Sequence, residues 1–399
     1  MNPPPRLAPP LTRLLQALDE ELQGLRDDDL FRRPAAVQAR RGMAIQVGGQ
    51  WGVCFSSNDY LGLSTDPAVT RAAADAAQEW GVGAGASRLL AGTTRWHQAL
   101  EAELAAWFGA EDALVYSSGY LTNLGALQTL LGPDDLVAID RLAHASLVEA
   151  CRASRAKRIV FRHHDLEQLR ALLGRYAGRR RRVIVTEGVF SMDGDRTPLA
   201  ELWQLASEHE AIVYLDDAHA VFAVGATGRG SPERAGVAHR ELIYMGALGK
   251  ALGCQGGFIV GPRTLIDALR NRAKSFIYTT ALAKPVAAAA CAALKRAEDP
   301  QQRRRLARHA QDLRDRLRAL GIIPDRPPSH IVPVVLGASS RAHVVSRELW
   351  HRGIFAPAIR PPTVPDGAAR LRISLSALHT DEQLRQLSDA LAAVLSPSA

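Results

Sequence analysis

The sequence predicts an α/β protein whose core is a mostly parallel β-sheet. The first observation is that amphipathic helical segments alternate with short apolar segments along most of the 399-residue chain. The second is that these short segments are almost continuously apolar, which is typical of parallel strands covered by helices on both faces. The third is the length of the chain, which is enough for one large and one smaller domain.

Helices are expected wherever apolar residues recur at a spacing of three or four. Such segments lie at residues 11–25, 67–80, 95–108, 120–131, 144–153, 165–174, 199–209, 263–273, 281–296, 301–319, 341–352 and 380–395. Strands are expected at the apolar runs between the helices, which are ALVYSS, LVAID, RIVF, RVIVTEG, AIVYLDDA, LIYMGAL and GGFIVG.

The pattern of the sequence changes near residue 285. Long charged helices appear there, and the later segments HIVPVVL and RLRISLS indicate a separate small α+β domain. We therefore expect an N-terminal arm at residues 1–60, a large α/β domain at residues 61–284 and a small C-terminal domain at residues 285–399.

The composition argues against several classes of protein. The four cysteines are far apart and lack a CxxC spacing, which fits a reducing cytoplasm better than a zinc site or a disulfide framework. No segment approaches the roughly 20 apolar residues of a membrane span, and no secretory signal is visible. We expect a cytoplasmic protein without a membrane partner.

The net charge of +8 is not accompanied by a nucleic-acid-binding motif, so no nucleic-acid partner is expected. The most basic run, RYAGRRRR at residues 175–182, is interpreted as a solvated loop. The alternative is a landing site for an anionic substrate or carrier.

Charged side chains follow two apolar strands of the predicted sheet. Asp216, Asp217 and His219 close AIVYLDDAHA, and Lys250 follows LIYMGAL. Because the carboxyl ends of parallel strands meet at one edge of a sheet, we expect these side chains to lie close together. A buried carboxylate is costly there unless it meets a positive partner, although an Asp can also cap the next element.

The Asp and Lys suit the two ends of pyridoxal phosphate. Its aldehyde takes a lysine as a Schiff base, and its ring nitrogen needs an acidic partner to stay protonated. Lys250 is assigned the first task and Asp216 the second. Because GALGKALGCQGG offers Lys250 no carboxylate, we expect a desolvated, cation-rich pocket that lowers its pKa. The helix start in YSSGYLTN would hold the phosphate through free N–H groups.

A series of ordered motifs extends over nearly the whole chain. They are FSSNDYLGL, GVGAGASRLLAGTTRWHQALE, SSGYLTN, DRLAHASLVEA, TEGVFSMDGD, DDAHA, GALGKALG, GGFIVG and RLRISLSALH. In these motifs the chain resembles the α-oxoamine synthases, which join an amino acid to an acyl thioester with loss of carbon dioxide. The resemblance implies fold type I, in which a large domain with a mostly parallel seven-stranded sheet between helices precedes a small α+β domain. It also implies pyridoxal 5'-phosphate as cofactor, no metal, and a homodimer with active sites between the subunits.

The resemblance assigns roles around the cofactor. It implies that Lys250, Asp216, His144 and His219 are the catalytic residues, with His144 stacked on the ring. It implies that His219 and Ser191 bond the phenolic oxygen of the cofactor. The further cofactor contacts that it implies are Ser118, Gly119 and Tyr120.

The resemblance also assigns substrate contacts. Arg372 would grip the carboxylate of the amino acid, because a guanidinium binds a carboxylate through two hydrogen bonds and keeps its charge. Arg360 and Thr363 would meet the acyl chain, and Arg32, or its neighbour Arg33, would cover the substrate. The other substrate contacts implied are Asn58, Tyr60 and His144.

Residues 358–374, AIRPPTVPDGAARLRIS, most resemble the members that condense L-alanine with a pimeloyl thioester in biotin biosynthesis. The acyl carrier, coenzyme A or a carrier protein, stays open. A sister enzyme such as 2-amino-3-ketobutyrate CoA ligase is one alternative, and an inactive homologue that keeps the fold is another.

Two positions depart from the family pattern. Ala247 stands where the family usually has a threonine that touches the phosphate, so one hydrogen bond worth roughly 1.5–3 kcal/mol would be missing. Ala220 stands where a glycine is common, which matters only if that residue needs a positive φ.

Overall fold

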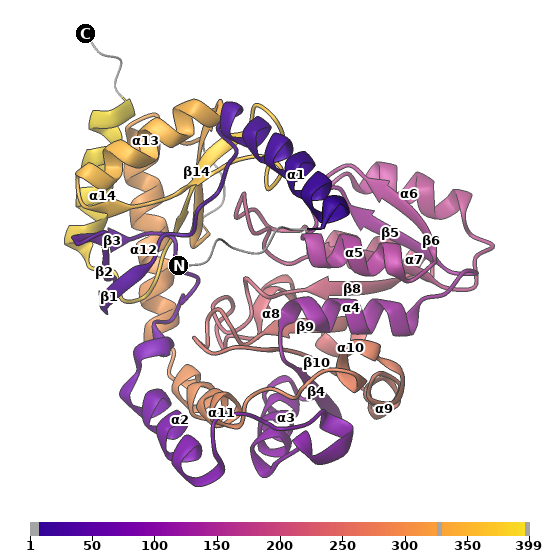
Figure 1. Ribbon diagram of the computed structural model, residues 1–399. Coiled ribbons are helices and arrows are strands. Elements are labelled where there is room, and N and C mark those ends of the chain that lie inside the picture. The colour runs from indigo at the N-terminus through magenta and orange to yellow at the C-terminus, as the bar shows by residue number, and fades with distance from the viewer. Residues whose placement is uncertain (1–7, 325–328, 396–399) are drawn as a thin grey trace.

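The computed structural model describes residues 8–324 and 329–395 and has the predicted α/β architecture (Figure 1). Seven strands form its largest sheet: β4 (Asp112–Tyr116), β5 (Leu136–Asp140), β6 (Lys157–Phe161), β7 (Arg182–Glu187), β8 (Ile212–Asp216), β9 (Ile243–Ala247) and β10 (Gly257–Gly261). The strand order is β4-β10-β9-β8-β7-β5-β6. Only β10 pairs antiparallel with its neighbours, so the expected mostly parallel sheet is confirmed.

Helices cover both faces of this sheet. Successive side chains of a strand point to opposite faces, so Tyr214 and Leu215 of β8 belong to two different hydrophobic clusters. The face of Tyr214 packs against α4 (Gly119–Leu130), α5 (Ala145–Ala153), α9 (Arg263–Arg272) and α10 (Lys274–Ile277). The face of Leu215 packs against α3 (Arg95–Phe108), α6 (Leu166–Arg175) and α7 (Leu199–Glu208). This double burial explains the continuous apolar runs of the strands.

A second region contains the C-terminal elements. An antiparallel sheet has the strands β11 (Ile331–Gly337), β14 (Ala369–Ser374) and β13 (Ala358–Ile359), with β14 in the middle. The helices of this part of the chain are α12 (Gln301–Ala319), α13 (Ser339–His351) and α14 (Asp381–Leu395). Figure 1 shows these elements grouped beside the large sheet.

The N-terminal strands join this second region. They are β1 (Val37–Arg41), β2 (Ala44–Val47) and β3 (Gln50–Cys54), and β12 (Ile354–Phe355) pairs in parallel with β3. Residues far apart in the sequence are therefore held together, as Figure 1 shows. The division at residues 60 and 284 stays a prediction.

The remaining elements connect these regions. They are α1 (Pro9–Asp27), α2 (Pro67–Trp80), α8 (Gly230–Ala235), α11 (Lys284–Glu298), a π-helical turn (Arg88–Gly92) and two 3-10 turns (Leu63–Thr65 and His239–Glu241). No helix in the described ranges is both long and apolar enough to cross a membrane.

Some boundaries differ from the expectation. Helix α11 begins at Lys284 rather than at residue 281, because Pro285 occupies the first turn, where its missing N–H costs nothing. The short elements α8, β12 and β13 were not predicted, since two to six residues are too few to show a hydrophobic period.

Ion pairs hold the basic run at residues 175–182 against the rest of the protein. Both side-chain oxygens of Asp135 accept hydrogen bonds from Arg180 at 2.9 Å, and Arg182 pairs with Glu210 at 3.0 Å. Arg182 begins β7, whereas Asp216 ends the parallel neighbour β8, so the run lies at the opposite edge of the sheet. These contacts favour the reading as a surface loop over a landing site for a substrate.

A buried ion pair fixes the segment before α3. Arg88 and Glu101 form two hydrogen bonds of 3.0 and 2.9 Å, and both residues are less than a tenth exposed. Glu101 also accepts from the backbone N–H of Val115 in β4 at 2.9 Å.

We predict that Glu101→Ala lowers the free energy of unfolding by about 3–5 kcal/mol, because it leaves the Arg88 charge buried without its partner. Urea unfolding of the cofactor-free protein measures this. The control is Glu79→Ala, which removes the partner of Arg95 in an exposed pair and is expected to cost less than about 1 kcal/mol. Equal losses in the two variants would contradict the assignment.

Candidate active site

A cavity of about 360 Å³ lies at the carboxyl edge of the large sheet. All four predicted catalytic residues line it, namely Lys250, Asp216, His144 and His219. Four further predicted contacts also line it, namely Ser118, Gly119, Tyr120 and Asn58. Its size is within the range of small-molecule sites. Ser118, Asp216 and Lys250 are far apart in the sequence but share one cavity because β4, β8 and β9 end at the same edge.

Asp216 is a buried carboxylate held by neutral donors. It ends β8 and is 6% exposed. The side-chain amide of Asn123 donates to its Oδ2 at 2.7 Å, and the backbone N–H of Ala218 donates to its Oδ1 at 3.0 Å. No ion pair joins it to a cation among the described residues. A buried carboxylate of this kind is suited to a positively charged group of a ligand.

Asn123 connects Asp216 to a wider network that the sequence reasoning missed. Its Oδ1 accepts from the hydroxyl of Tyr214 at 2.8 Å, and its amide also donates to the Ser146 hydroxyl at 2.9 Å. That hydroxyl lies 2.8 Å from Nδ1 of His144. The orientations of Asp216 and His144 are therefore coupled. The available signal was a polar residue within the apolar stretch of α4.

Lys250 follows β9 and extends into the same cavity. No hydrogen bond or ion pair joins its ammonium to another residue of the described ranges. Burial lowers its pKa from the ordinary value to about 8, although the charges of Asp216 and Glu187 act in the opposite direction. The expected direction and the expected desolvation are thus confirmed, but the expected surplus of cations is wrong. Among the principal electrostatic contributors only Arg372 is a cation, and desolvation dominates.

Glu187 is a second acidic residue that was not predicted. It ends β7 and accepts from the backbone N–H of His144 at 2.7 Å. Burial and the charge of Asp216 raise the pKa of Glu187 to about 8, so its environment favours the protonated form more than that of an ordinary glutamate. Burial lowers the pKa of His144, which favours its neutral ring. The quoted motif TEGVFSMDGD contained Glu187, but a buried position could not be read from it.

His219 is linked to the C-terminal region through Tyr60. Its Nδ1 lies 2.6 Å from the Tyr60 hydroxyl, which is 3.3 Å from Nη2 of Arg372. Burial and the charges of Lys250 and Arg372 lower the pKa of His219 well below its usual value. Arg372 also donates to Oδ1 of Asn58 at 3.1 Å and to the backbone oxygen of Ser191.

Ser191 itself is not among the residues that line the cavity. Its loop is anchored through His163, whose ring lies 2.9 Å from Asp140 and 2.6 Å from Asp195. Burial alone would lower the pKa of His163, but the hydrogen bonds to both carboxylates raise it to about 9. The contact of Ser191 with the phenolic oxygen stays a prediction.

Three predicted substrate contacts lie outside the lining of this cavity. Arg32 donates to the backbone oxygen of Pro361 at 2.8 Å, and Arg360 donates to that of Asp29. Thr363 is bonded to Arg360 through the backbone at 3.1 Å. These contacts tie the segment after α1 to the loop before β14, but none of the three residues lines the cavity. Their role toward the acyl chain stays a prediction.

The segment after α1 also contains Arg33, the alternative to Arg32 as the residue that covers the substrate. Arg32 reaches the loop at Pro361, whereas the guanidinium of Arg33 lies 5.5 Å from the ring centre of Phe31. The structure therefore favours Arg32 as the residue that faces the rest of the protein.

A family model described as aminotransferase class I and II matches residues 52–391. The chain belongs to this family. Two curated relatives are named 8-amino-7-oxononanoate synthase. The one from Anaeromyxobacter dehalogenans strain 2CP-1 is 46% identical over 382 residues and covers 96% of both chains. The one from Geobacter sulfurreducens is 41% identical over 384 residues and covers 96% of this chain and 98% of the relative.

Solved structures agree with this membership. Serine palmitoyltransferase from S. paucimobilis, with a bound PLP-myriocin aldimine, superposes with a TM-score of 0.91 at 30% identity, covering 96% of this chain and 98% of that one. The 8-amino-7-oxononanoate synthase of Francisella tularensis has a TM-score of 0.74 at 28% identity, covering 86% and 97%. The resemblance to the α-oxoamine synthases within the aminotransferase family is thereby confirmed.

The cavity fits pyridoxal 5'-phosphate, the cofactor of this aminotransferase family. Asp216 offers a buried negative charge without a bonded cation, and Lys250 offers a partly neutral amine in the same cavity. The N-terminus of α4 presents backbone N–H groups where Gly119 lines the cavity. A Cβ on Gly257 would lie 2.7 Å from Cα of Gly119, so this start of α4 needs a glycine in the neighbouring strand.

The two departures from the family pattern have different consequences. Ala247 ends β9 and lines the cavity, so a hydroxyl is missing at a position that faces the ligand. Ala220 is buried and is not among the residues with a positive φ, so its side chain introduces no backbone strain.

We predict that Lys250 of the cofactor-free protein loses its proton near pH 8, because burial penalises its charged form. The pH dependence of acetylation, followed at Lys250 by mass spectrometry, measures this. In Asp216→Asn the midpoint is expected to fall further, since the Asp216 charge favours the ammonium. A midpoint near that of an ordinary lysine, about 10.4, would contradict the geometry.

Proposed function

We propose that this protein condenses L-alanine with a pimeloyl thioester to 8-amino-7-oxononanoate, releasing the thiol and carbon dioxide, as a step of biotin biosynthesis. The observation that carries the proposal is the cavity in which Lys250 and Asp216 meet. The substrate class is supported by the relatives named 8-amino-7-oxononanoate synthase, which are 41–46% identical over almost the whole chain.

The cofactor, when bound, supplies an electrophilic carbon and a ring that draws electron density from the α-carbon of the amino acid. Asp216 would keep a proton on the ring nitrogen, because its buried negative charge needs a positive partner. Among the described residues it is bonded only to neutral donors. Lys250 provides an amine that is substantially neutral near pH 8 and can therefore accept the α-proton. His144 lines the same cavity with a mostly neutral ring, which suits stacking on a planar ligand.

Arg372 is the proposed partner of the substrate carboxylate. Arg372 is 8% exposed, and its hydrogen bonds go to neutral oxygens of Ser191, Asn58, Ser374 and Tyr60. Arg372 is not among the residues that line the cavity, but Tyr60 links it to His219, which does line it. No carboxylate among the described residues pairs with Arg372, so its buried positive charge is available near this end of the site. Desolvated charges of this kind are stable only with a counter-charge.

The sister reactions are the main alternative. The neighbour with a TM-score of 0.91 is a serine palmitoyltransferase, but it is only 30% identical to this chain. The sequence relatives with 41–46% identity favour the alanine reaction. We propose that the far end of the acyl chain contacts Arg32, Arg360 and Thr363. The acyl carrier is either coenzyme A or a carrier protein.

A homodimer in the cytoplasm completes the proposal. One face of α1 exposes leucines that a second copy would cover: Leu11, Leu14, Leu15, Leu18, Leu22 and Leu25. The four cysteines are free thiols, which suits a reducing compartment. We further propose the division into an arm at residues 1–60, a large domain at residues 61–284 and a small domain at residues 285–399.

We predict that Lys250→Ala abolishes formation of 8-amino-7-oxononanoate from L-alanine and pimeloyl-CoA, together with the yellow colour of the bound cofactor. Product mass and the absorption spectrum measure the two effects. Lys274→Ala, which changes an exposed lysine, is the control and keeps both. Product formation by Lys250→Ala would refute the assigned role.

We predict that Asp216→Asn retains most of the cofactor but lowers kcat by roughly 100-fold or more, because the ring nitrogen loses the partner of its proton. Cofactor retained after gel filtration is compared with the rate of product formation. Parallel losses of cofactor and of rate would contradict this separation.

We predict that Arg372→Lys raises the KM for L-alanine by roughly tenfold or more and leaves the KM for pimeloyl-CoA unchanged, because an ammonium cannot replace the paired N–H groups. Steady-state kinetics measure the effect, and the exposed Arg385→Lys is the control. An unchanged KM for alanine would exclude this role.

A further inference from the structure

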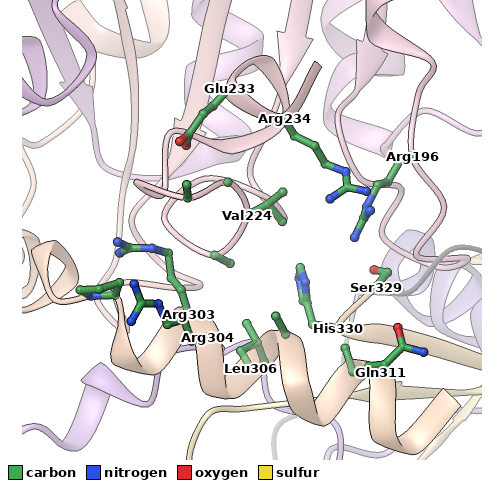
Figure 2. A pocket seen from close by; sticks show the side chains of 16 residues that line it. Arg196, Val224, Glu233, Arg234, Arg303, Arg304, Leu306, Gln311, Ser329 and His330 are labelled. Atoms are coloured by element: carbon green, nitrogen blue, oxygen red, sulfur yellow. The ribbon is translucent and has the colours of Figure 1, made fainter. Parts of the chain in front are cut away.

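A second cavity, of about 630 Å³, lies away from the candidate active site (Figure 2). The loop at residues 223–226, helix α8 and the first half of α12 enclose it. Among the described residues, none lines both this cavity and that of Lys250. His330 lines it and packs on Tyr60 with ring centres 4.2 Å apart, so this ring stands between the two sites.

The lining is strongly positive. Among the described residues, one acid lines the cavity, Glu233, together with four arginines: Arg196, Arg234, Arg303 and Arg304. Figure 2 shows the guanidinium groups of Arg196 and Arg234 side by side at one end of the cavity. Burial and the neighbouring positive charge of Arg234 lower the pKa of Arg196 to about 10. An anion beside Arg234 would be attracted by its positive charge.

Among the described residues, Glu233 does not pair with the arginines of α8 and α12 that line the cavity. One oxygen of Glu233 accepts from the backbone N–H of Thr227 at 2.8 Å, and the other accepts from that of Arg229 at 3.0 Å. No ion pair joins Glu233 to Arg234, Arg303 or Arg304 within the described ranges.

The arginines of α8 and α12 are available for a ligand. Arg303 is 5% exposed, donates to the backbone oxygen of Ala297, and leaves its Nε without a hydrogen-bond partner among the described residues. Arg234 and Arg304 are exposed, and neither is paired with a carboxylate of the residues that the structure describes. A buried donor without a partner is costly in a folded protein unless a ligand or water satisfies it.

His330 adds a second unsatisfied group. It is 4% exposed, and its Nε2 has no hydrogen-bond partner among the described residues. Figure 2 shows its ring directed into the cavity. Burial and the charges of Arg196 and Arg372 lower its pKa to about 3, so the ring is neutral. A neutral imidazole nitrogen bonds a hydroxyl in either tautomer, because a hydroxyl both donates and accepts.

A neighbouring cavity of about 400 Å³ extends this space. It shares Arg303 and Arg304 with the first cavity, and Trp107, Arg229 and Glu298 also line it. The indole nitrogen of Trp107 is buried without a hydrogen-bond partner in the described ranges. The two cavities together therefore offer cations, a hydroxyl-binding nitrogen and an aromatic ring.

We propose that these joined cavities bind a nucleotide, with its phosphates at the arginines, its ribose hydroxyls near His330 and its base near Trp107. Arginine forks match phosphate oxygens, and an aromatic face accepts a base by stacking. A free nucleotide and the nucleotide part of coenzyme A share this chemistry.

The test is calorimetric titration of the cofactor-loaded protein with ADP and, separately, with pyrophosphate, since the bound cofactor fills its own phosphate site. In the double variant R234Q/R304Q both affinities are expected to fall roughly tenfold or more. The control R240Q/R316Q removes two exposed arginines outside the cavity and is expected to bind as the unchanged protein does. Trp107→Leu is expected to weaken ADP but not pyrophosphate.

Three results would overturn the proposal: no binding of ADP to the unchanged protein, equal losses in the two double variants, or full ADP affinity in Trp107→Leu. Melting temperatures of all variants check that each is folded. The KM for pimeloyl-CoA then shows whether the bound nucleotide is free or belongs to coenzyme A. Only this measurement rests on the proposed function. A KM raised only in R234Q/R304Q indicates the nucleotide of coenzyme A, and an unchanged KM indicates a free nucleotide.

Discussion

The candidate active site depends on one buried carboxylate. Asp216 lies at the end of the central strand β8 and is held by an amide group of Asn123 and a backbone N–H of Ala218 rather than by a cation. Neutral donors fix its position and leave its charge available. A ligand that brings a positive charge into this cavity is therefore stabilised at one defined place, and the electronic function of the proposed cofactor follows from that placement.

The sheet topology brings the other groups to this carboxylate. Strands β7, β8 and β9 are parallel neighbours, so Glu187, Asp216 and the segment before Lys250 meet at one edge. The bonds from Asn123 then reach the residues at the start of α5. From the other side, Arg372 of the C-terminal sheet reaches His219 through Tyr60. A movement of that sheet would thus change the proposed substrate contact of Arg372 and the proposed cofactor contact of His219 together.

Much of this could be predicted from the sequence. Continuous apolar runs predicted the parallel sheet, and the charged ends of two of them predicted that Asp216 and Lys250 share a cavity. The remaining features depend on burial that a single sequence does not display. Asn123 and Glu187 are ordinary polar residues until the fold surrounds them, and the charges around Lys250 come mainly from acids rather than from the expected cations. The contacts of Arg32 and Arg360 join positions more than 300 residues apart, which no local pattern encodes.

The central claim is that Asp216 keeps the ring nitrogen of the cofactor protonated. The most direct measurement is the 15N chemical shift of that nitrogen in protein reconstituted with 15N-labelled pyridoxal phosphate. A shift typical of a protonated pyridine that stays constant across neutral pH, and that changes to the unprotonated value in Asp216→Ala, is the predicted result. A nitrogen that titrates as the free cofactor does, or that is indifferent to Asp216→Ala, would contradict the account.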